Sequence, residues 1–287
     1  MTYKATDIQI NQSNNPKYEA LLDDFIQEVF GFSFAPWFEQ KLWDERYISY
    51  SIIEEGKMLS NVCIYKTEML VQGQRAQALS FGAVGTRKCA KGKGLSRLLM
   101  EHVLSLHPNT PAYLFANESV LDFYPRFGFR PVQTYKPVIT AKINNDPAKA
   151  IKLDEDDEIV TKAISERAVF SNLVDCLNTA PIQMFHMLLE YAEDIYYLPA
   201  HDAVVIAQQE GSELFIADVM AKKPIDFETL KAALPFESVD TIEFGFSPDW
   251  LGVTPIWEPA DMADEPFFVR GEWNLPDKFC YPAMSET

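Results

Sequence analysis

The strongest constraint on the fold of this 287-residue chain is a glycine-containing loop, residues 87–94, between an apolar strand and an amphipathic helix. The strand is predicted over residues 76–86 and the helix over residues 95–106. Glycines let a backbone approach a ligand closely, and the free amides at a helix start attract pyrophosphate. The loop matches neither Gly-x-Gly-x-x-Gly nor the P-loop by spacing, and a plain tight turn is the alternative interpretation. The basic residues around it are Arg87, Lys88, Lys91, Lys93 and Arg97.

Further elements of the N-terminal half follow from hydrophobic periodicity. Apolar residues at helical spacing predict a helix over residues 16–30, and a second helical stretch covers residues 37–45. Alternating and continuous apolar runs bounded by turn residues predict strands. These strands are expected over residues 47–54, 59–71, 76–86, 112–116 and 129–136, with a short helix over residues 119–123. The order of strands and helices predicts an α/β fold with a mixed sheet.

The periodicity is lost over residues 143–158, which are strongly acidic. We interpret them as a linker, with the acidic run as a solvated surface rather than a metal site. The chain is therefore divided into a first domain, residues 1–142, and a second domain, residues 159–287. In the second domain we expect helices over residues 159–177, 181–191 and 226–234, and strands over residues 203–208, 213–220 and 241–246.

The second domain repeats a pattern of the first. Residues 79–86 lead through the glycine loop into a helix, and residues 214–221 lead through a short loop into the helix of residues 227–234. The second loop, residues 222–225, reads Lys-Lys-Pro-Ile and contains no glycine. We interpret the second domain as a duplicated α/β unit that has lost the phosphate-binding loop.

Composition excludes several classes of protein. Apolar residues make up 47% of the chain, which suffices for a core, but no apolar run approaches the roughly 18 residues that span a bilayer. The N-terminus lacks the apolar core of a signal peptide. The four cysteines show no CxxC spacing, and the four histidines form no metal or nucleophile pattern, so no metal site is expected. We expect a cytoplasmic protein with reduced cysteines.

The net charge of −17 is distributed unevenly. Residues 151–287 carry 27 acidic and 8 basic side chains, whereas residues 1–150 carry 15 acidic and 17 basic side chains. An acidic half repels anions and attracts cations. Nucleic acid is therefore not an expected partner, whereas a cationic molecule is. Solubility alone is the other explanation for the excess of acid. The sequence leaves open whether the chain forms a homo-oligomer.

The glycine loop resembles the signature of the GCN5-related N-acetyltransferase (GNAT) superfamily. Val84, Gly92 and Gly94 stand where that signature has its strand-ending Val and the glycines of [Gln/Arg]-x-x-Gly-x-[Gly/Ala]. Cys89 replaces the usual Gln or Arg, and Thr86 the common Pro. The resemblance implies acetyl-CoA as co-substrate, with pantetheine along the strand and pyrophosphate on the loop. The implied contacts are Ala83, Val84, Thr86, Arg87, Lys88, Cys89, Ala90, Lys91, Gly92, Lys93, Gly94, Leu95 and Ser96.

Residues 112–129 resemble the second motif of the same family, a strand followed by Asn, a short helix, Phe-Tyr and Gly-Phe. By this resemblance, Asn117 bonds the pantetheine arm and Tyr124 stands near the thioester sulfur as general acid. A phenol with a pKa of about 10 can donate a proton to a departing thiolate. The two motifs imply a GNAT fold for the first domain. The second resembles the degenerate GNAT-like domain of some bacterial two-domain members, including those of the enhanced-intracellular-survival type, whose third domain this chain is too short to include.

Two further sets of residues concern the amine acceptor. A protonated amine must lose a proton before it attacks a thioester, and Glu68 and Glu118 are candidates for the general base. Each also fits an ordinary surface acid, and the family often uses a water chain instead. Residues 30–38 contain five aromatic side chains, of which we expect Phe32, Phe34 and Trp37 to contact the acceptor through apolar and cation–π contacts. Core packing is the alternative for these rings.

The sequence thus predicts an N-acetyltransferase that transfers the acetyl group of acetyl-CoA to a primary amine through a tetrahedral intermediate. A cationic small molecule is the expected acceptor. Two alternatives stay open: acetylation of a protein or peptide amine, and an acyl-CoA-binding sensor or interaction module without catalysis.

Overall fold

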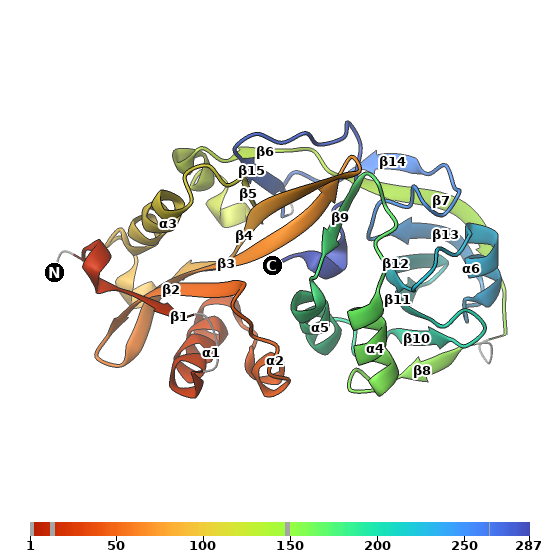
Figure 1. Ribbon diagram of the computed structural model, residues 1–287, viewed down its shortest axis with the longest axis horizontal. Helices are drawn as coiled ribbons and strands as arrows, with labels where there is room; N and C mark the ends of the chain where they lie inside the picture. The colour runs from red at the N-terminus through yellow and green to blue at the C-terminus, as the bar shows by residue number, and fades with distance from the viewer. Residues whose placement is uncertain (1–2, 12–14, 147–149, 264) are drawn as a thin grey trace.

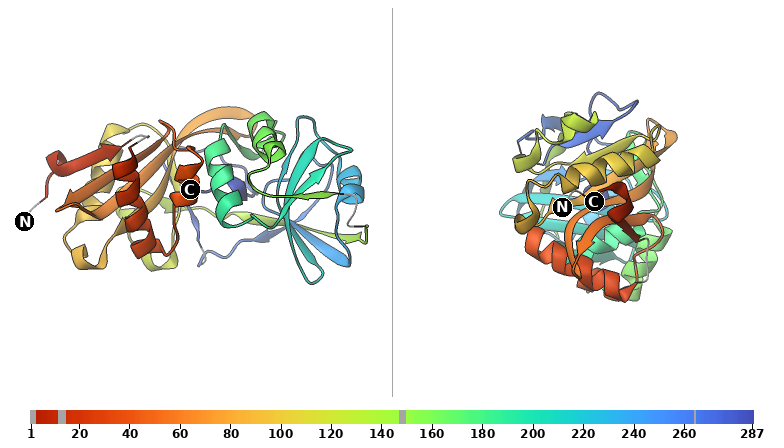
Figure 2. Two further views of the ribbon diagram at one scale, coloured as in Figure 1. Left: turned by 90° about the horizontal axis from the view of Figure 1, so that it is seen from below. Right: turned by 90° about the vertical axis from the view of Figure 1, so that its left-hand side faces the viewer.

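Two mixed β-sheets lie side by side in the computed structural model, and Figure 2 shows the molecule elongated along the line that joins them. The structure describes residues 3–11, 15–146, 150–263 and 265–287. In the first sheet the strand order is β1 (Ile8–Asn11), β2 (Tyr47–Glu54), β3 (Lys57–Val71), β4 (Gln74–Thr86), β5 (Ala112–Phe115), β15 (Phe267–Arg270) and β6 (Arg130–Pro131), and β9 (Val174–Leu177) pairs with β3. In the second sheet it is β14 (Ile256–Pro259), β7 (Tyr135–Ile143), β13 (Val239–Phe244), β12 (Glu213–Met220), β11 (Ala203–Glu210), β10 (Ile195–Leu198) and β8 (Ile151–Leu153).

Helices cover both faces of the first sheet (Figure 1). Helix α3 (Leu95–Leu106) packs on one face through Leu99, Met100 and Val103, all fully buried. On the other face lie α1 (Pro16–Phe30) and α2 (Ala35–Glu39), with α5 (Ala180–Leu189) beside them. The remaining helices, α4 (Glu158–Glu166) and α6 (Phe227–Ala233), pack against the second sheet. None of the helices in the described part of the chain is long and apolar enough to cross a bilayer.

Most local elements of the first half agree with the periodicity of the sequence, and helix ends follow capping rules. The strand expected over residues 129–136 is wrong, because β6 covers only two residues and β7 begins at Tyr135 in the other sheet. Helix α1 begins after Asn15, whose Oδ1 accepts a hydrogen bond from the Tyr18 amide, and it ends at Gly31 in the left-handed conformation. The second helix was expected to run to residue 45 but stops at Glu39, because Lys41 takes a positive φ of 56° that a helix cannot contain. The 3₁₀ helices are η1 (Ala5–Asp7), η2 (Lys88–Ala90), η3 (Glu118–Val120), η4 (Tyr124–Phe127) and η6 (Ala283–Ser285).

The expected helix over residues 159–177 is wrong in its second half. Helix α4 ends at Glu166, and β9 pairs antiparallel with the end of β3, from Glu68 to Val71. Arg167, at the end of α4, places its guanidinium between Asp175 of β9 and Asp218 of β12, at 3.2 and 3.0 Å. This buried ion cluster and the strand pairing override the apolar periodicity of the segment, because both are contacts between residues far apart in sequence.

Each sheet includes strands from the other side of the expected domain boundary at residue 142. Strand β7 begins at Tyr135 and pairs with β13 and β14 of the second sheet. In return, β15 lies between β5 and β6 in the first sheet. The segment expected as a linker, residues 143–158, contributes β8 to the second sheet. The division into two domains stays a prediction. Each sheet contains strands from both sides of the expected boundary.

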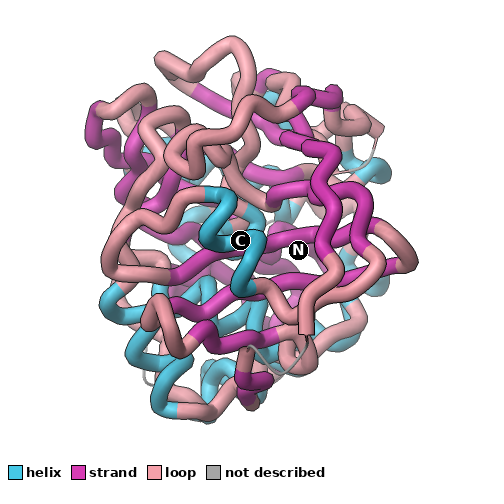
Figure 3. Tube along the Cα trace, turned by 90° about the vertical axis from the view of Figure 1, so that its right-hand side faces the viewer, coloured by secondary structure: helices cyan, strands magenta, loops and turns pink. Residues whose placement is uncertain are grey.

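The repeat expected from the sequence has the same strand pairing in both sheets. Strand β3 pairs antiparallel with β4, and β4 pairs parallel with β5 across α3. In the second sheet β11 pairs antiparallel with β12, and β12 pairs parallel with β13 across α6. Figure 3 shows this second sheet from its outer end.

Candidate active site

The first feature of the site is an opening between the parallel strands β4 and β5. Their pairing is limited to Leu79 with Ala112 and Ser80 with Tyr113. Beyond Ser80, β4 continues to Thr86 through a bulge, where Ala83 takes a positive φ of 48° and its carbonyl accepts a hydrogen bond from Asn61 Nδ2 at 3.0 Å. This part of β4 therefore presents backbone groups that β5 does not use.

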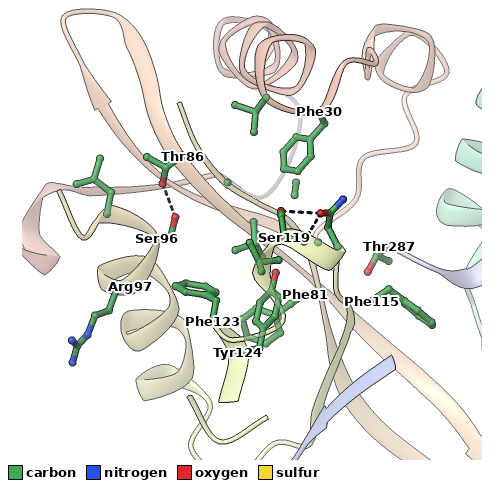
Figure 4. Close-up of a pocket in the computed structure, with 18 of the residues that line it drawn as sticks. Phe30, Phe81, Thr86, Ser96, Arg97, Phe115, Ser119, Phe123, Tyr124 and Thr287 are labelled. Carbon is green, nitrogen blue, oxygen red and sulfur yellow. Dashed lines mark hydrogen bonds between the residues drawn. The ribbon is translucent and has the colours of Figure 1, made fainter. Parts of the chain in front are cut away.

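The glycine loop and the start of α3 continue this edge. Gly94 stands just before α3 with a φ of 75°, and Gly92 has a φ of 78°. Glycine is favoured at both positions because an L side chain is strained in this region. No side chain caps α3, so the amides of its first turn point outward at the positive end of the helix. Thr86 Oγ1 and Ser96 Oγ, 2.5 Å apart, tie the end of β4 to this turn (Figure 4).

The basic residues of the loop separate into two groups. Lys91 and Arg97 are exposed beside the helix start and line the cavity described below. Arg87 is fully buried and points the other way, where its guanidinium binds Asp24 and Glu28 of α1 and its Nε donates to Met58 O. Its side chain holds the loop to α1. Lys88, Cys89 and Lys93 are exposed and lie outside the described lining of the cavity.

A cavity of about 1150 Å³ extends from the glycine loop to the C-terminal residues of the chain. It is lined by the start of α3, the open part of β4, the segment after β5, the α1–α2 connection and α5 of the neighbouring half. Figure 4 shows Thr86 and Ser96 at one end and Phe115 and Thr287 at the other. The sequence-predicted residues that line it are Ala83, Val84, Thr86, Ala90, Lys91, Gly92, Gly94, Leu95, Ser96, Asn117 and Tyr124, together with Phe32, Phe34 and Trp37.

Tyr124 lies between the two ends of the cavity. Its ring is 5% exposed and packs against Phe123, Phe129 and Phe268, while Figure 4 shows its hydroxyl pointing into the cavity. Burial raises the pKa of this hydroxyl above its ordinary value of 10, so the phenol is protonated at every pH near neutrality. Close by, Asn117 Oδ1 accepts hydrogen bonds from the amide and hydroxyl of Ser119, which orients the amide group of Asn117.

The two acids considered as general base lie elsewhere. Glu68 lies in the second half of β3. It forms an ion pair with Arg75 and accepts a hydrogen bond from Asn178, which follows β9. Glu118 is exposed, and neither residue belongs to the described lining of the cavity.

A different acid, Glu286, belongs to the lining of the cavity at the end away from the glycine loop. The backbone carbonyl of Glu286 bonds His186 Nε2 of α5 at 2.9 Å, which anchors the residue. Burial, followed by the charges of Glu265 and Glu190, raises the pKa of the Glu286 carboxyl to about 8. Nothing in the sequence near Glu286 distinguishes it from the other acids of the second half, so the hypothesis based on sequence missed it. No described group of three or more His, Cys, Asp or Glu residues could hold a metal ion.

The aromatic segment forms one wall of the same end. Phe34 and Trp37 are buried, whereas Phe30 and Phe32 are each 40% exposed. The Phe32 ring centroid lies 5.7 Å from that of Phe34 and 6.0 Å from that of Phe185 on α5. At Gly85 a Cβ would lie 2.9 Å from Val29 Cγ1, so the end of α1 packs directly on β4. The aromatic residues of the segment 30–38 therefore both pack in the core and line the cavity.

The strands of the second sheet stay together for longer at the equivalent point. Strands β12 and β13 pair from Glu213 to Ile216, and the Gly245 amide then donates to Ile216 O at 2.8 Å. A Cβ at Gly245 would lie 2.8 Å from the Phe215 ring, so the two strands are tightly packed there. The pairing of β12 with β13 is therefore longer than that of β4 with β5.

Residues 14–132 match the family model described as an acetyltransferase (GNAT) domain. The chain carries a GNAT acetyltransferase domain. This domain contains the open strand, the glycine loop and Tyr124. A search of curated proteins finds no match.

Solved structures extend the similarity beyond the GNAT domain, at the level of the fold. A GCN5-related N-acetyltransferase from Anabaena variabilis aligns with a TM-score of 0.57 and 14% identity, over 92% of this chain and 72% of that one. Eis1 from Mycobacterium abscessus aligns with a TM-score of 0.55 and 17% identity, over 91% and 73%. A putative acetyltransferase from Pyrococcus horikoshii aligns with a TM-score of 0.51 and 10% identity, over 99% and 98%. The GNAT fold is thus followed by a second α/β unit, as in multi-domain GNAT structures.

Proposed function

We propose that the chain transfers the acetyl group of acetyl-CoA to the primary amine of a cationic small molecule. The observation that carries the proposal is the cavity of about 1150 Å³, which joins the glycine loop to an end lined by Glu286 and Glu265. A polyanionic co-substrate and a cationic acceptor would thus enter from ends of opposite charge and meet beside Tyr124.

The loop end has the groups that bind coenzyme A. The free amides of the first turn of α3, with Lys91 and Arg97 beside them, suit a pyrophosphate. The unpaired edge of β4 from Phe81 to Thr86 suits the pantetheine amides, which would add to it like a strand. Four basic or polar residues of the loop would not contact the coenzyme directly, because they lie outside the described lining of the cavity: Arg87, Lys88, Cys89 and Lys93.

Two residues would move protons during the transfer. The Glu286 carboxylate takes a proton from the ammonium, and the amine nitrogen then bonds to the thioester carbon to give a tetrahedral intermediate. When this intermediate collapses, the carbon–sulfur bond breaks and the Tyr124 hydroxyl donates its proton to the departing sulfur. The remaining extra proton on the nitrogen passes to the Tyr124 oxygen, which restores the phenol, and Glu286 releases its proton to solvent. The products are the N-acetyl amine and coenzyme A with a free thiol.

The Glu286 assignment predicts the pH dependence. Because the carboxyl is protonated below a pKa of about 8, kcat/KM should rise with pH and level off above that value. Glu286→Gln should remove this limb and lower kcat/KM by about 100-fold, measured as thiol release between pH 6 and 9.5. Glu193→Gln, which changes an exposed acid paired with Lys152, is the matched control. An unchanged pH profile in Glu286→Gln would exclude this residue as the base.

The same carboxyl has the opposite effect on stability. A carboxyl whose pKa is raised in the folded state stabilises the fold below its unfolded pKa, and that contribution is lost as pH rises through about 8. Ionisation of Glu286 should therefore raise kcat/KM and lower the free energy of unfolding as the pH increases.

The first experiment is calorimetry with acetyl-CoA, followed by thiol release across amines, basic peptides and aminoglycosides. Binding with amine-dependent release supports the proposal. Release with peptides alone would instead favour acetylation of a protein amine. Binding without release on any acceptor would favour a sensor, and the absence of binding would contradict the assignment of the loop.

A further inference from the structure

The acceptor end of the cavity is apolar apart from its carboxyl groups. The side chains that line it from α1, the α1–α2 connection and α5 are aromatic or aliphatic: Phe30, Phe32, Phe34, Trp37, Ile182 and Phe185. No Lys or Arg is among the described residues at this end. An amine bound here would have its body against hydrocarbon and its charge at the carboxyls.

Two other polar groups at this end already have partners. Trp37 Nε1 donates to Pro181 O at 2.8 Å. The Thr287 hydroxyl is bonded to that of Ser80. Hydroxyl groups of an acceptor would thus lose water without gaining partners on these walls, which is unfavourable.

Two acids, Glu286 and Glu265, line this end and are called the Glu286 cluster. The nearby acid Glu190 lies outside the described lining and pairs with His186 Nδ1 at 3.2 Å. One ammonium group would satisfy the Glu286 cluster, whereas a molecule with amines spread along its length would place the others against the aromatic wall. The charge pattern therefore fits an acceptor with a single amine at one end.

Two aromatic rings of the cavity lining keep exposed surface. Phe30 and Phe32 are each 40% exposed, and their ring centroids lie 6.3 Å apart. Figure 4 shows the Phe30 ring pointing from the end of α1 into the cavity. Exposed aromatic surface at a cavity often marks a binding site, and a further ring would extend this row in edge-to-face contact.

We propose that the acceptor is a primary aralkylamine, an amine on a short chain that ends in an aromatic ring, rather than a polyamine or an aminoglycoside. The proposal rests on the proposed function, because it specifies the acceptor for the same reaction. The ammonium would lie at the Glu286 cluster, and the ring would lie against Phe32.

The experiment compares thiol release with 2-phenylethylamine, spermidine, kanamycin and ethylamine at saturating acetyl-CoA. We expect kcat/KM for 2-phenylethylamine to exceed that for spermidine and kanamycin by at least about tenfold. A preference for spermidine or kanamycin would overturn the aralkylamine proposal and leave acetyl transfer standing. Failure of every amine would overturn both proposals.

A variant distinguishes ring contact from general activity. Phe32→Ala should raise KM for 2-phenylethylamine about tenfold and change KM for ethylamine less than about twofold. Phe32 lies outside the helices and is exposed, so its truncation should leave folding intact. Leu106→Ala, an exposed apolar residue at the end of α3, is the matched control. Equal effects on both amines would show that Phe32 does not contact the ring of the acceptor.

Discussion

Tyr124→Phe is expected to lower kcat about 100- to 1000-fold and to leave the Kd of acetyl-CoA within about twofold. The substitution removes the hydroxyl that would protonate the departing sulfur. It keeps the ring that packs against Phe129 and Phe268, with centroids 6.1 Å away in each case, so the cavity should keep its shape. Because burial raises the pKa of Tyr124, the wild-type enzyme should lose no activity from phenol ionisation below about pH 10.

The measurement is steady-state thiol release, with calorimetry for the coenzyme. Tyr197→Phe removes an exposed hydroxyl bonded to Asp202, away from the cavity, and serves as the control. A Tyr124→Phe enzyme with undiminished kcat would show that the proton comes from another group. A loss of coenzyme binding equal to the loss of kcat would instead point to a role in binding.

Arg167→Ala should have the largest effect on stability, a loss of about 3–5 kcal/mol in the free energy of unfolding. Its side chain is 10% exposed and compensates the carboxylates of Asp175 and Asp218, whose side chains are 6% exposed. Without Arg167 these two carboxylates stay buried without a cation. Gln183 of α5 also donates to Asp218, at 3.4 Å, so the cluster joins β9, β12 and the helix that carries Phe185.

The variant should recover part of its stability at low pH. The pKa of Asp175 is already raised by burial and by Asp218, and loss of the Arg167 charge should raise it further. A raised carboxyl pKa stabilises the folded state below the unfolded pKa, and the effect is lost as pH rises through the folded pKa. Urea unfolding at pH 5 and pH 8 measures the difference. Arg97→Ala breaks an exposed pair with Glu101 and should cost less than about 1 kcal/mol. Equal costs for the two variants would contradict the role of the cluster.

Local features of the fold were predictable from the sequence because they depend on neighbours along the chain. Helix α1 and helix α3 begin and end where periodicity and capping residues indicate. The glycines at 92 and 94 predicted a loop before a helix start, and both line the cavity. Tyr124 was found through a motif of adjacent residues, and it lies in the same cavity.

Features that depend on distant contacts were not predictable in this way. Arg87 was expected to face the phosphates, but the two acids of α1 draw its guanidinium into the interior. Strand β15 was missed because its four residues are stable only between β5 and β6. A strand of this length has too few local contacts to form an independent pattern.

The sequence by itself determined the glycine loop, the GNAT motifs and the acidic character of the second half, since each is a property of adjacent residues or of composition. Only the tertiary structure decided that Glu286 and the aromatic rings of residues 30–37 line the same cavity as the glycine loop. The reason is physical: strand pairing, burial and the pKa of Glu286 depend on groups that meet only when the two sheets have formed.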